Sequence, residues 1–263
     1  MRILVCVKQV PDIDQVDVTR SKDGFACLAP FSEYRMNRYD EFAVEAALRI
    51  EAGGAAPVGI DVVTVGPQRA EEVLRRALGM GAHEGIHLQS LEDQYLGPGT
   101  VAAGIARYAG LKDYDLALCG CMSEDGMHGQ VGPRLAGHLK WPCAVQAVRL
   151  QLNETADAVT VEKETEGGGR ERLRLNLPAV IAVQSGINRP RYPALSKLLR
   201  ANARALETIP LTEIAPPPVE SRFVGAILPE PVRAGRVLAG TLTEKAAALL
   251  ALLKEKALIS GAA

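Results

Sequence analysis

The segment that decides the fold prediction spans residues 116–142 and reads LALCGCMSEDGMHGQVGPRLAGHLKWP. Residues 116–118 are apolar and predict the end of a buried strand, and a loop rich in glycine and acidic residues follows. Val131, Leu135 and Leu139 then recur at the spacing of a helix with one buried face. Such a loop directs free backbone N–H groups and the positive end of the helix to one point, which suits a phosphate. An ordinary strand-to-helix turn is the alternative, because a single glycine-rich loop is a weak signal.

Within this loop, glycines permit close backbone approach or positive φ at four positions: Gly120, Gly126, Gly129 and Gly132. Ser123 and Gln130 are candidates for additional side-chain hydrogen bonds to a bound anion. The loop is therefore a candidate phosphate-binding segment.

Upstream, residues 3–7 are a continuous apolar run that predicts a strand buried on both faces, and residues 60–65, 86–88 and 115–119 predict further strands. Helical periodicity lies between them, from residue 39 to Gly53-Gly54, from 71 to 79–81, and over 100–109. Strands alternating with helices predict a doubly wound parallel sheet, in which ligands sit beyond the carboxyl ends of the strands. Residues 7–12, 65–67 and 120–131 all leave strand ends, so we expect them to line one crevice.

After Pro142 the pattern changes to β segments at residues 144–152, 158–164 and 171–177, separated by turn signals. Leu173 and Leu175 alternate with Arg172 and Arg174, which predicts one buried and one exposed face. Another apolar run at 179–183 predicts a further strand. We interpret this region as an antiparallel β addition to the parallel sheet.

The C-terminal part has the composition of an arm. Residues 210–231 are rich in proline and lack periodicity, so they do not predict a packed domain. Thr241 and Glu244 match a helix capping box, and leucines at 242, 249, 250 and 253 form an apolar stripe. We therefore predict a core domain over residues 1–205 and, over 206–263, an arm ending in a helix that docks on its own core or on a partner.

Composition and charge argue against several classes of protein. The 263 residues carry a formal net charge of −1, which favours neither nucleic acid nor an anionic membrane surface as a partner. Hydrophobic residues make up 48% and aromatic residues 4%, so we expect a large aliphatic core. No apolar stretch approaches membrane-spanning length and Met1 leads directly into a strand pattern, so we expect a cytoplasmic protein.

The cysteines and histidines indicate neither a metal site nor a catalytic centre. The five cysteines are an odd number in apolar contexts, which does not predict a disulfide framework. Cys119 and Cys121, with His128 and Cys143, were considered as metal ligands, but the close pair is spaced too tightly for a usual zinc site. No Ser-His-Asp or Cys-His order is present, so we predict no catalytic residue.

Several of these segments, in this order, resemble the β subunit of the electron-transfer flavoproteins. The resemblance covers essentially the whole chain. It rests on residues 5–12 (VCVKQVPD), Asn37 with Glu41 and 43–48 (AVEAAL), 63–67 (VTVGP) and 77–82 (ALGMGA). The most specific part is 161–164 (VEKE) with Gly167-Gly168, followed by 173–175 (LRL), 177–180 (LPAV) and 188–192 (NRPRY).

The resemblance implies a Rossmann-like domain that binds an adenine nucleotide, AMP in simple electron carriers. Carried over residue by residue, the nucleotide would contact Cys6, Asn37, Arg38, Tyr39, Asp40, Val65, Gly120, Cys121, Met122, Ser123, Glu124, Asp125, Gly126, Met127, His128, Gly129, Gln130 and Val131. The implied partner is an α subunit that holds a redox FAD near the interface, with the C-terminal arm docking on that subunit.

The resemblance also implies a route for the electrons, from acyl-CoA dehydrogenases in fatty acid oxidation to a membrane quinone reductase. The segment 185–205 corresponds to a recognition loop for the dehydrogenases, and Leu195 matches its hydrophobic anchor. Packing of Leu195 in the core of a short helix is the alternative.

The loop departs from the family pattern at Cys121, Met127 and His128, whereas its end, residues 130–133 (QVGP), matches. Backbone phosphate binding is therefore expected to persist, with altered side-chain contacts. Residues 6–12 and Tyr39-Asp40 look more like the flavin-bifurcating branch, in which a second FAD replaces AMP and accepts a hydride from NADH. A stand-alone nucleotide-binding sensor on the same core is a further alternative.

Overall fold

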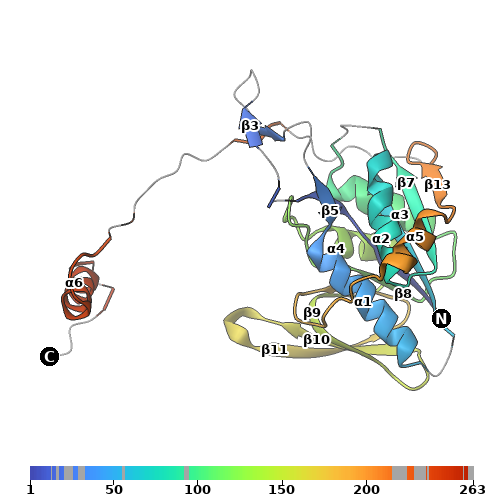
Figure 1. Cartoon of the computed structure of the whole chain (residues 1–263). Coiled ribbons are helices and arrows are strands. Elements are labelled where there is room, and N and C mark those ends of the chain that lie inside the picture. Colours follow the sequence, from blue (N-terminus) through green and yellow to red (C-terminus); the bar gives the residue numbers. More distant parts are fainter. Residues whose placement is uncertain are drawn as a thin grey trace. The chain divides into compact units, whose positions relative to one another are not determined.

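The computed structural model describes residues 1–12, 14–15, 18–20, 26–28, 33–54, 57–91, 95–214, 224–227, 235, 237–256 and 258–259. The chain divides into two compact units, Met1–Gly225 and Ala226–Ala263. The first unit is an α/β fold built on one large sheet (Figure 1).

That sheet has nine strands in the order β11-β10-β9-β12-β8-β1-β6-β7-β13. In the part of the sheet that runs β9-β12-β8-β1-β6-β7-β13, every neighbouring pair is parallel. Strand β10 is antiparallel to both of its neighbours, β9 and β11. The strands are β1 Arg2–Cys6, β6 Gly59–Gly66, β7 Glu84–Gln89, β8 Leu116–Gly120, β9 Cys143–Leu152, β10 Ala158–Glu164, β11 Arg170–Asn176, β12 Ala179–Val183 and β13 Glu207–Pro210. The predicted Rossmann-like parallel sheet with an antiparallel addition is confirmed.

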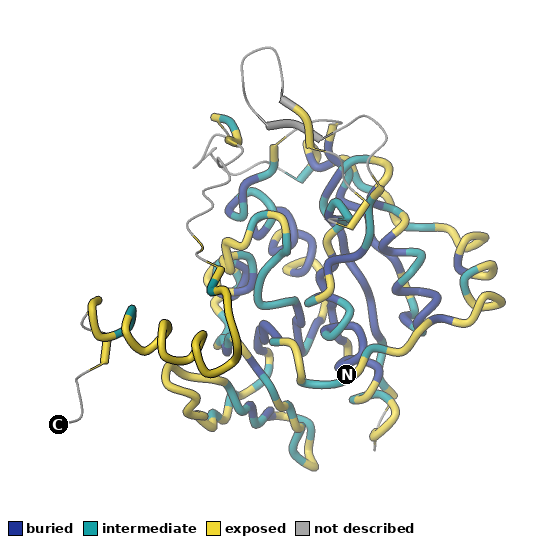
Figure 2. Tube along the Cα trace, turned by 60° about the vertical axis from the view of Figure 1, so that its left-hand side comes forward, coloured by how far each residue is buried: buried dark blue, intermediate teal, exposed yellow. Residues whose placement is uncertain are grey.

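Helices cover both faces of the sheet. They are α1 Arg38–Ala52, α2 Glu71–Met80, α3 Pro98–Ala109, α4 Val131–Leu139 and α5 Leu195–Asn202, with short 3₁₀ turns η1 Gln68–Ala70 and η2 Glu166–Gly168. Apolar side chains of α1 and α2 share one hydrophobic cluster, and those of α3 and α4 share a second. On β1, Ile3 and Val5 belong to the first cluster and Leu4 to the second, so the strand is buried on both faces. Figure 2 shows these central strands as the most buried part of the trace.

The strand order creates a switch point beside β1. The chain runs from β1 outward to β6 and β7, and then returns to β8 on the opposite side of β1. Connections therefore leave the carboxyl ends of β1 and β8 in opposite directions, and a crevice opens between them. This is the place at which the sequence predicted that three strand-end segments meet.

The antiparallel addition follows the predicted alternation. Leu173 and Leu175 of β11 are half-buried against the first cluster, whereas Arg172 and Arg174 are exposed. The strand forms one border of the sheet beside β10.

The core domain extends further along the chain than residue 205, the C-terminal limit that we expected from the sequence. Strand β13 adds to the sheet in parallel with β7, and the first compact unit continues to Gly225. Leu211, just after β13, is buried against Gly104 of α3. The strand has four residues and includes a proline, so the sequence offered no alternation from which to predict it.

Two small ribbons were also not predicted. Strand β2 (Gln9–Pro11) pairs with β5 (Tyr34–Met36), and β3 (Val18–Arg20) pairs with β4 (Ala26–Leu28). The first ribbon lies directly after β1, where it contributes to the cavity described below. Three-residue strands are too short to be recognised from periodicity.

The second unit contains α6 (Leu242–Glu255), which begins with the predicted capping box. The Thr241 hydroxyl accepts from the Glu244 N–H, and the Glu244 carboxylate accepts from the Thr241 N–H. Much of the proline-rich segment over 210–231 lies outside the described residues, so docking of the arm remains a prediction. None of the helices in the described part of the chain has the length and apolar character needed to cross a membrane.

Candidate functional site

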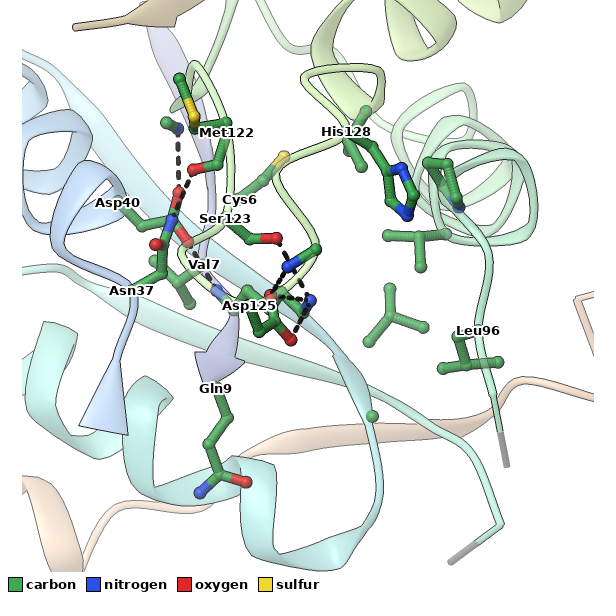
Figure 3. A pocket seen from close by; sticks show the side chains of 18 of the residues that line it. Cys6, Val7, Gln9, Asn37, Asp40, Leu96, Met122, Ser123, Asp125 and His128 are labelled. Carbon is green, nitrogen blue, oxygen red and sulfur yellow. Dashed lines mark hydrogen bonds and ion pairs between the residues drawn. The ribbon is translucent and has the colours of Figure 1, made fainter. Parts of the chain in front are cut away.

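A cavity of about 730 Å³ lies at the carboxyl ends of β1, β6 and β8 (Figure 3). Residues of all three predicted segments line it: most of residues 7–12 after β1, residues 65–67 after β6, and most of residues 120–131 after β8. Its volume is within the range typical of pockets for small organic ligands, roughly 300–1,000 Å³. The topology rule applied to the sequence therefore located this crevice.

Asn37, which immediately precedes α1, holds the loop after β8 in place. Its side-chain amide donates to the Met122 carbonyl at 3.0 Å, and its carbonyl oxygen accepts from the Glu124 N–H at 3.2 Å. Asn37 is 1% exposed, so both bonds are shielded from water. The Glu124 carboxylate reaches back to the Arg38 N–H at 3.2 Å, at the positive end of α1.

Lys8 and Gln9 tie the segment after β1 to the other two. The Lys8 ammonium lies 2.7 Å from both carboxylate oxygens of Asp125 and 3.3 Å from the Ser123 hydroxyl. The side chain of Gln9 donates to the Arg69 carbonyl at 2.9 Å. Burial opposes ionisation of Asp125, but the charge and hydrogen bonds of Lys8 outweigh it and lower the pKa of this carboxyl below its usual range.

The start of α4 supplies a site for an anion. Gly129, Gln130 and Val131 line the cavity, and the first N–H groups of a helix have no partner within it. Gly129 has φ +62°, a left-handed conformation that favours glycine, and this allows the loop to turn into the helix. The Gln130 side-chain oxygen accepts from Arg134 Nε at 3.0 Å along the helix.

Apolar side chains line another part of the cavity. They are Val65, Leu96, Val101, Ile105 and Val131. Figure 3 places Leu96 and His128 on the opposite side of the view from Asn37 and Asp40. A ligand with an anionic group and an apolar ring system matches this division into a polar and an apolar part.

The structure brings most of the predicted site residues to the cavity. Its lining includes Cys6, Asn37, Asp40, Val65, Gly120, Cys121, Met122, Ser123, Asp125, Gly126, His128, Gly129, Gln130 and Val131. Arg38, Tyr39, Glu124 and Met127 do not line it. Glu124 instead holds the loop from outside, and Met127 is exposed with φ 51°.

Sequence reasoning missed several lining residues. Tyr34, Arg69, Tyr95 and Leu96 come from the β2–β5 ribbon, η1 and the segment before α3, which lie far from the glycine-rich loop in sequence. Lys8 could have been identified, because it is the cation nearest the end of the first predicted strand.

The cysteines around the cavity are free thiols. Burial raises the pKa of Cys6 and of Cys119, and it raises the pKa of the half-buried Cys121 to about 11. Within the described residues, no group of three or more His, Cys, Asp or Glu side chains is placed to hold a metal ion.

Leu195 begins α5 and is 72% exposed. The alternative of core packing is therefore wrong for this side chain. Leu198, one turn later, takes the inward position: its Cδ2 lies 2.6 Å from where a Cβ at Gly79 of α2 would be. Arg75 of α2 donates to the carbonyls of Ala201 and Asn202 at the end of α5, so the helix is held while Leu195 faces outward.

Fold and cavity together define a doubly wound, Rossmann-like α/β protein with a ligand crevice at its switch point. A family model described as "Electron transfer flavoprotein domain" matches residues 28–214. The chain is 34% identical over 257 residues to the electron transfer flavoprotein subunit beta of Bos taurus, covering 97% of each chain. It is 33% identical to that of Bacillus subtilis and 30% to that of Methylophilus methylotrophus, covering at least 97% of each chain. The chain therefore belongs to the electron transfer flavoprotein family, among the β subunits.

Proposed function

We propose that this chain is the nucleotide-binding half of a cytoplasmic electron-carrying heterodimer. Its partner is an α subunit with a redox FAD, and the complex carries electrons from an acyl-CoA dehydrogenase to a membrane quinone reductase. One observation carries the proposal: in a β subunit of this family, three strand-end segments and a helix N-terminus converge on one cavity of about 730 Å³.

The residues present fit AMP as a structural ligand. The backbone N–H groups at the start of α4 would hold the phosphate, and the absence of a side chain at Gly129 leaves the backbone accessible there. Lys8 also lines the cavity, with its ammonium paired to the Asp125 carboxylate at 2.7 Å. The apolar wall that includes Val65 and Ile105 would cover the adenine.

The chain's own task in this proposal is binding and positioning. FAD on the α subunit supplies the redox chemistry when bound, and protein groups set its location and environment. No acid, base or nucleophile in this chain is required for that task. The cavity and the outward face of α5 are the two features that the proposal uses.

The exposed apolar side chains around α5 support a docking role. Tyr192, Leu195 and Leu199 are 83%, 72% and 63% exposed. Large apolar side chains on a helix that is itself held at its end lose little conformational entropy on binding. We propose that Leu195 is the anchor that enters a hydrophobic pocket of the dehydrogenase.

The C-terminal helix supports pairing with an α subunit. Leu242, Leu249 and Leu250 of α6 are exposed, and no residue of the helix is buried. A capped helix with uncovered leucines is suited to packing against another protein surface. We therefore propose that the arm completes its packing on the α subunit.

A second candidate is a flavin-bifurcating complex with a second FAD in this chain. The apolar lining of the cavity favours this candidate. Besides the segments that would hold a phosphate, the lining includes Leu96 and Val101. A flavin ring needs such a surface, whereas AMP would use only part of it. In this variant NADH would be the electron donor.

The deciding experiment is to express the chain with its α partner, purify the complex, denature it and quantify the released nucleotides. One FAD and one AMP per heterodimer support the simple carrier. Two FADs without AMP support the bifurcating complex. A monomer that binds nucleotide without an α subunit would favour a sensor, and a complex without nucleotide in this chain would contradict the proposal. Reduction of the complex by an acyl-CoA dehydrogenase, compared with reduction by NADH, then identifies the donor.

A further inference from the structure

Asp40, in the first turn of α1, joins three elements at the base of the cavity. Its Oδ2 accepts from the Lys8 N–H at 2.8 Å, and its Oδ1 accepts from the Gly120 N–H at 2.9 Å. Lys8 follows β1, and Gly120 is the last residue of β8. The residue lines the cavity (Figure 3) and is 5% exposed, and both carboxylate oxygens accept from backbone groups.

The two strand ends need such a connection because their own pairing has already stopped. In the described part of the chain, backbone pairing between β1 and β8 ends at Val5 and Leu118. Beyond that level, β8 continues beside β12, while the backbone after β1 turns toward β6 and the β2–β5 ribbon. Asp40 therefore bridges the two segments at the level where sheet hydrogen bonds no longer do.

These segments are also the walls of the cavity, since residues 6–9 and most of residues 119–131 line it. A change in their separation would move the start of α4 relative to the segment after β1. We propose that Asp40 is a positioning residue of the nucleotide site, whose carboxylate sets the distance between the β1 and β8 ends. This inference rests on the proposed nucleotide-binding function and concerns the hydrogen bonds of Asp40 to the two strand ends.

The role makes nucleotide affinity depend on pH. Burial raises the pKa of Asp40 to about 7, and the hydrogen bonds from Lys8, Asn37 and Gly120, together with the charge of Lys8, offset burial only in part. An ionised carboxylate accepts from both backbone N–H groups. A protonated carboxyl carries a hydrogen on one oxygen, so that oxygen is a poorer acceptor for its N–H group. Affinity should therefore fall as the pH decreases through about 7.

The thiols near Asp40 do not titrate in that interval. The thiols of Cys6 and Cys119 have pKa values raised by burial, and the pKa of Cys121 is raised to about 11, so all three stay neutral. Asn37 also donates a side-chain hydrogen bond to Asp40, and the charged neighbour Lys8 pairs its ammonium with Asp125. His128 lines the cavity and is the titratable group to be controlled for.

The test measures AMP binding to the αβ complex after removal of its own nucleotide, by calorimetry at pH 6 and pH 8. Asp40→Asn keeps the shape of the side chain but presents an N–H₂ group to one of the two backbone donors. We expect this variant to bind AMP roughly tenfold more weakly than the wild type at pH 8, the value of one charge-assisted hydrogen bond. At pH 6 the two proteins should converge.

Comparison at equal pH cancels ionisation of the AMP phosphate, which is the same for both proteins. A His128→Gln variant should retain the dependence on pH, because it leaves Asp40 intact. If Asp40→Asn does not assemble, the wild type titrated with adenosine, which lacks a phosphate, provides the same pH profile.

The outcomes separate this inference from the function on which it rests. A wild type that binds no nucleotide at either pH overturns the proposed function. Equal affinity of wild type and Asp40→Asn at pH 8, or a deficit of the same size at both pH values, overturns the positioning role. A flat adenosine profile of the wild type would do so as well.

Discussion

Gly120→Ala tests how closely α1 packs against the end of β8. A Cβ atom at Gly120 would lie 2.5 Å from Asp40 Oδ1, 2.5 Å from the Cβ of Tyr39 and 2.9 Å from the Tyr39 carbonyl carbon. Two of these three atoms belong to Tyr39 at or next to its backbone, so a change of rotamer cannot remove the overlap. The start of α1 must move away from β8.

The cost follows from two effects. Overpacking of a closely packed site costs about 1–3 kcal/mol, and a clash with backbone falls in the upper part of that range. Displacement of Asp40 also weakens its hydrogen bond to the Gly120 N–H, and a bond to a charged group contributes about 1.5–3 kcal/mol. Because the two effects share one movement, we expect a total loss of about 3 kcal/mol.

The assay is urea unfolding of the αβ complex, followed by circular dichroism, together with its nucleotide content. Gly137→Ala is the matched control, because a Cβ there meets nothing within 4 Å and the residue lies inside α4. Alanine in a helix interior should stabilise by about 0.5–1 kcal/mol relative to glycine. If Gly120→Ala unfolds at the wild-type urea concentration with nucleotide fully retained, the reasoning on this contact is refuted.

Two further predictions concern the site and the docking face. Gly129→Val should abolish nucleotide retention, because a β-branched residue does not adopt φ +62° and its side chain would occupy the space of the phosphate; full occupancy in the purified complex would contradict this assignment. Leu195→Ala should slow electron transfer from an acyl-CoA dehydrogenase and leave the flavin content unchanged. The free energy of unfolding should change by less than about 0.5 kcal/mol, since Leu195 is 72% exposed. Loss of flavin from that variant would show that Leu195 supports the fold.

Local patterns in the chain predicted the principal elements correctly. Continuous apolar runs such as residues 3–7 and 179–183 formed central strands, because a strand buried on both faces needs no polar alternation. The capping residues Thr241 and Glu244 marked the start of α6, since both partners of a capping box lie within one turn. Strand β13 escaped prediction because four residues with a terminal proline pair through tertiary contact with β7.

For the candidate site too, local sequence patterns and tertiary contacts decided different features. The sequence by itself determined which three segments leave the parallel strands, and therefore that they meet at one edge of the sheet. Only the tertiary structure decided what each side chain does there. On α5, for which the sequence did not decide whether Leu195 faces the core, the structure places Leu195 outward and Leu198 inward. It also joins Asp40 to Gly120, 80 residues apart in the chain, by a hydrogen bond. Periodicity is a property of neighbours along the chain, whereas a hydrogen bond between distant residues depends on how whole elements pack, and a local pattern carries no information on that.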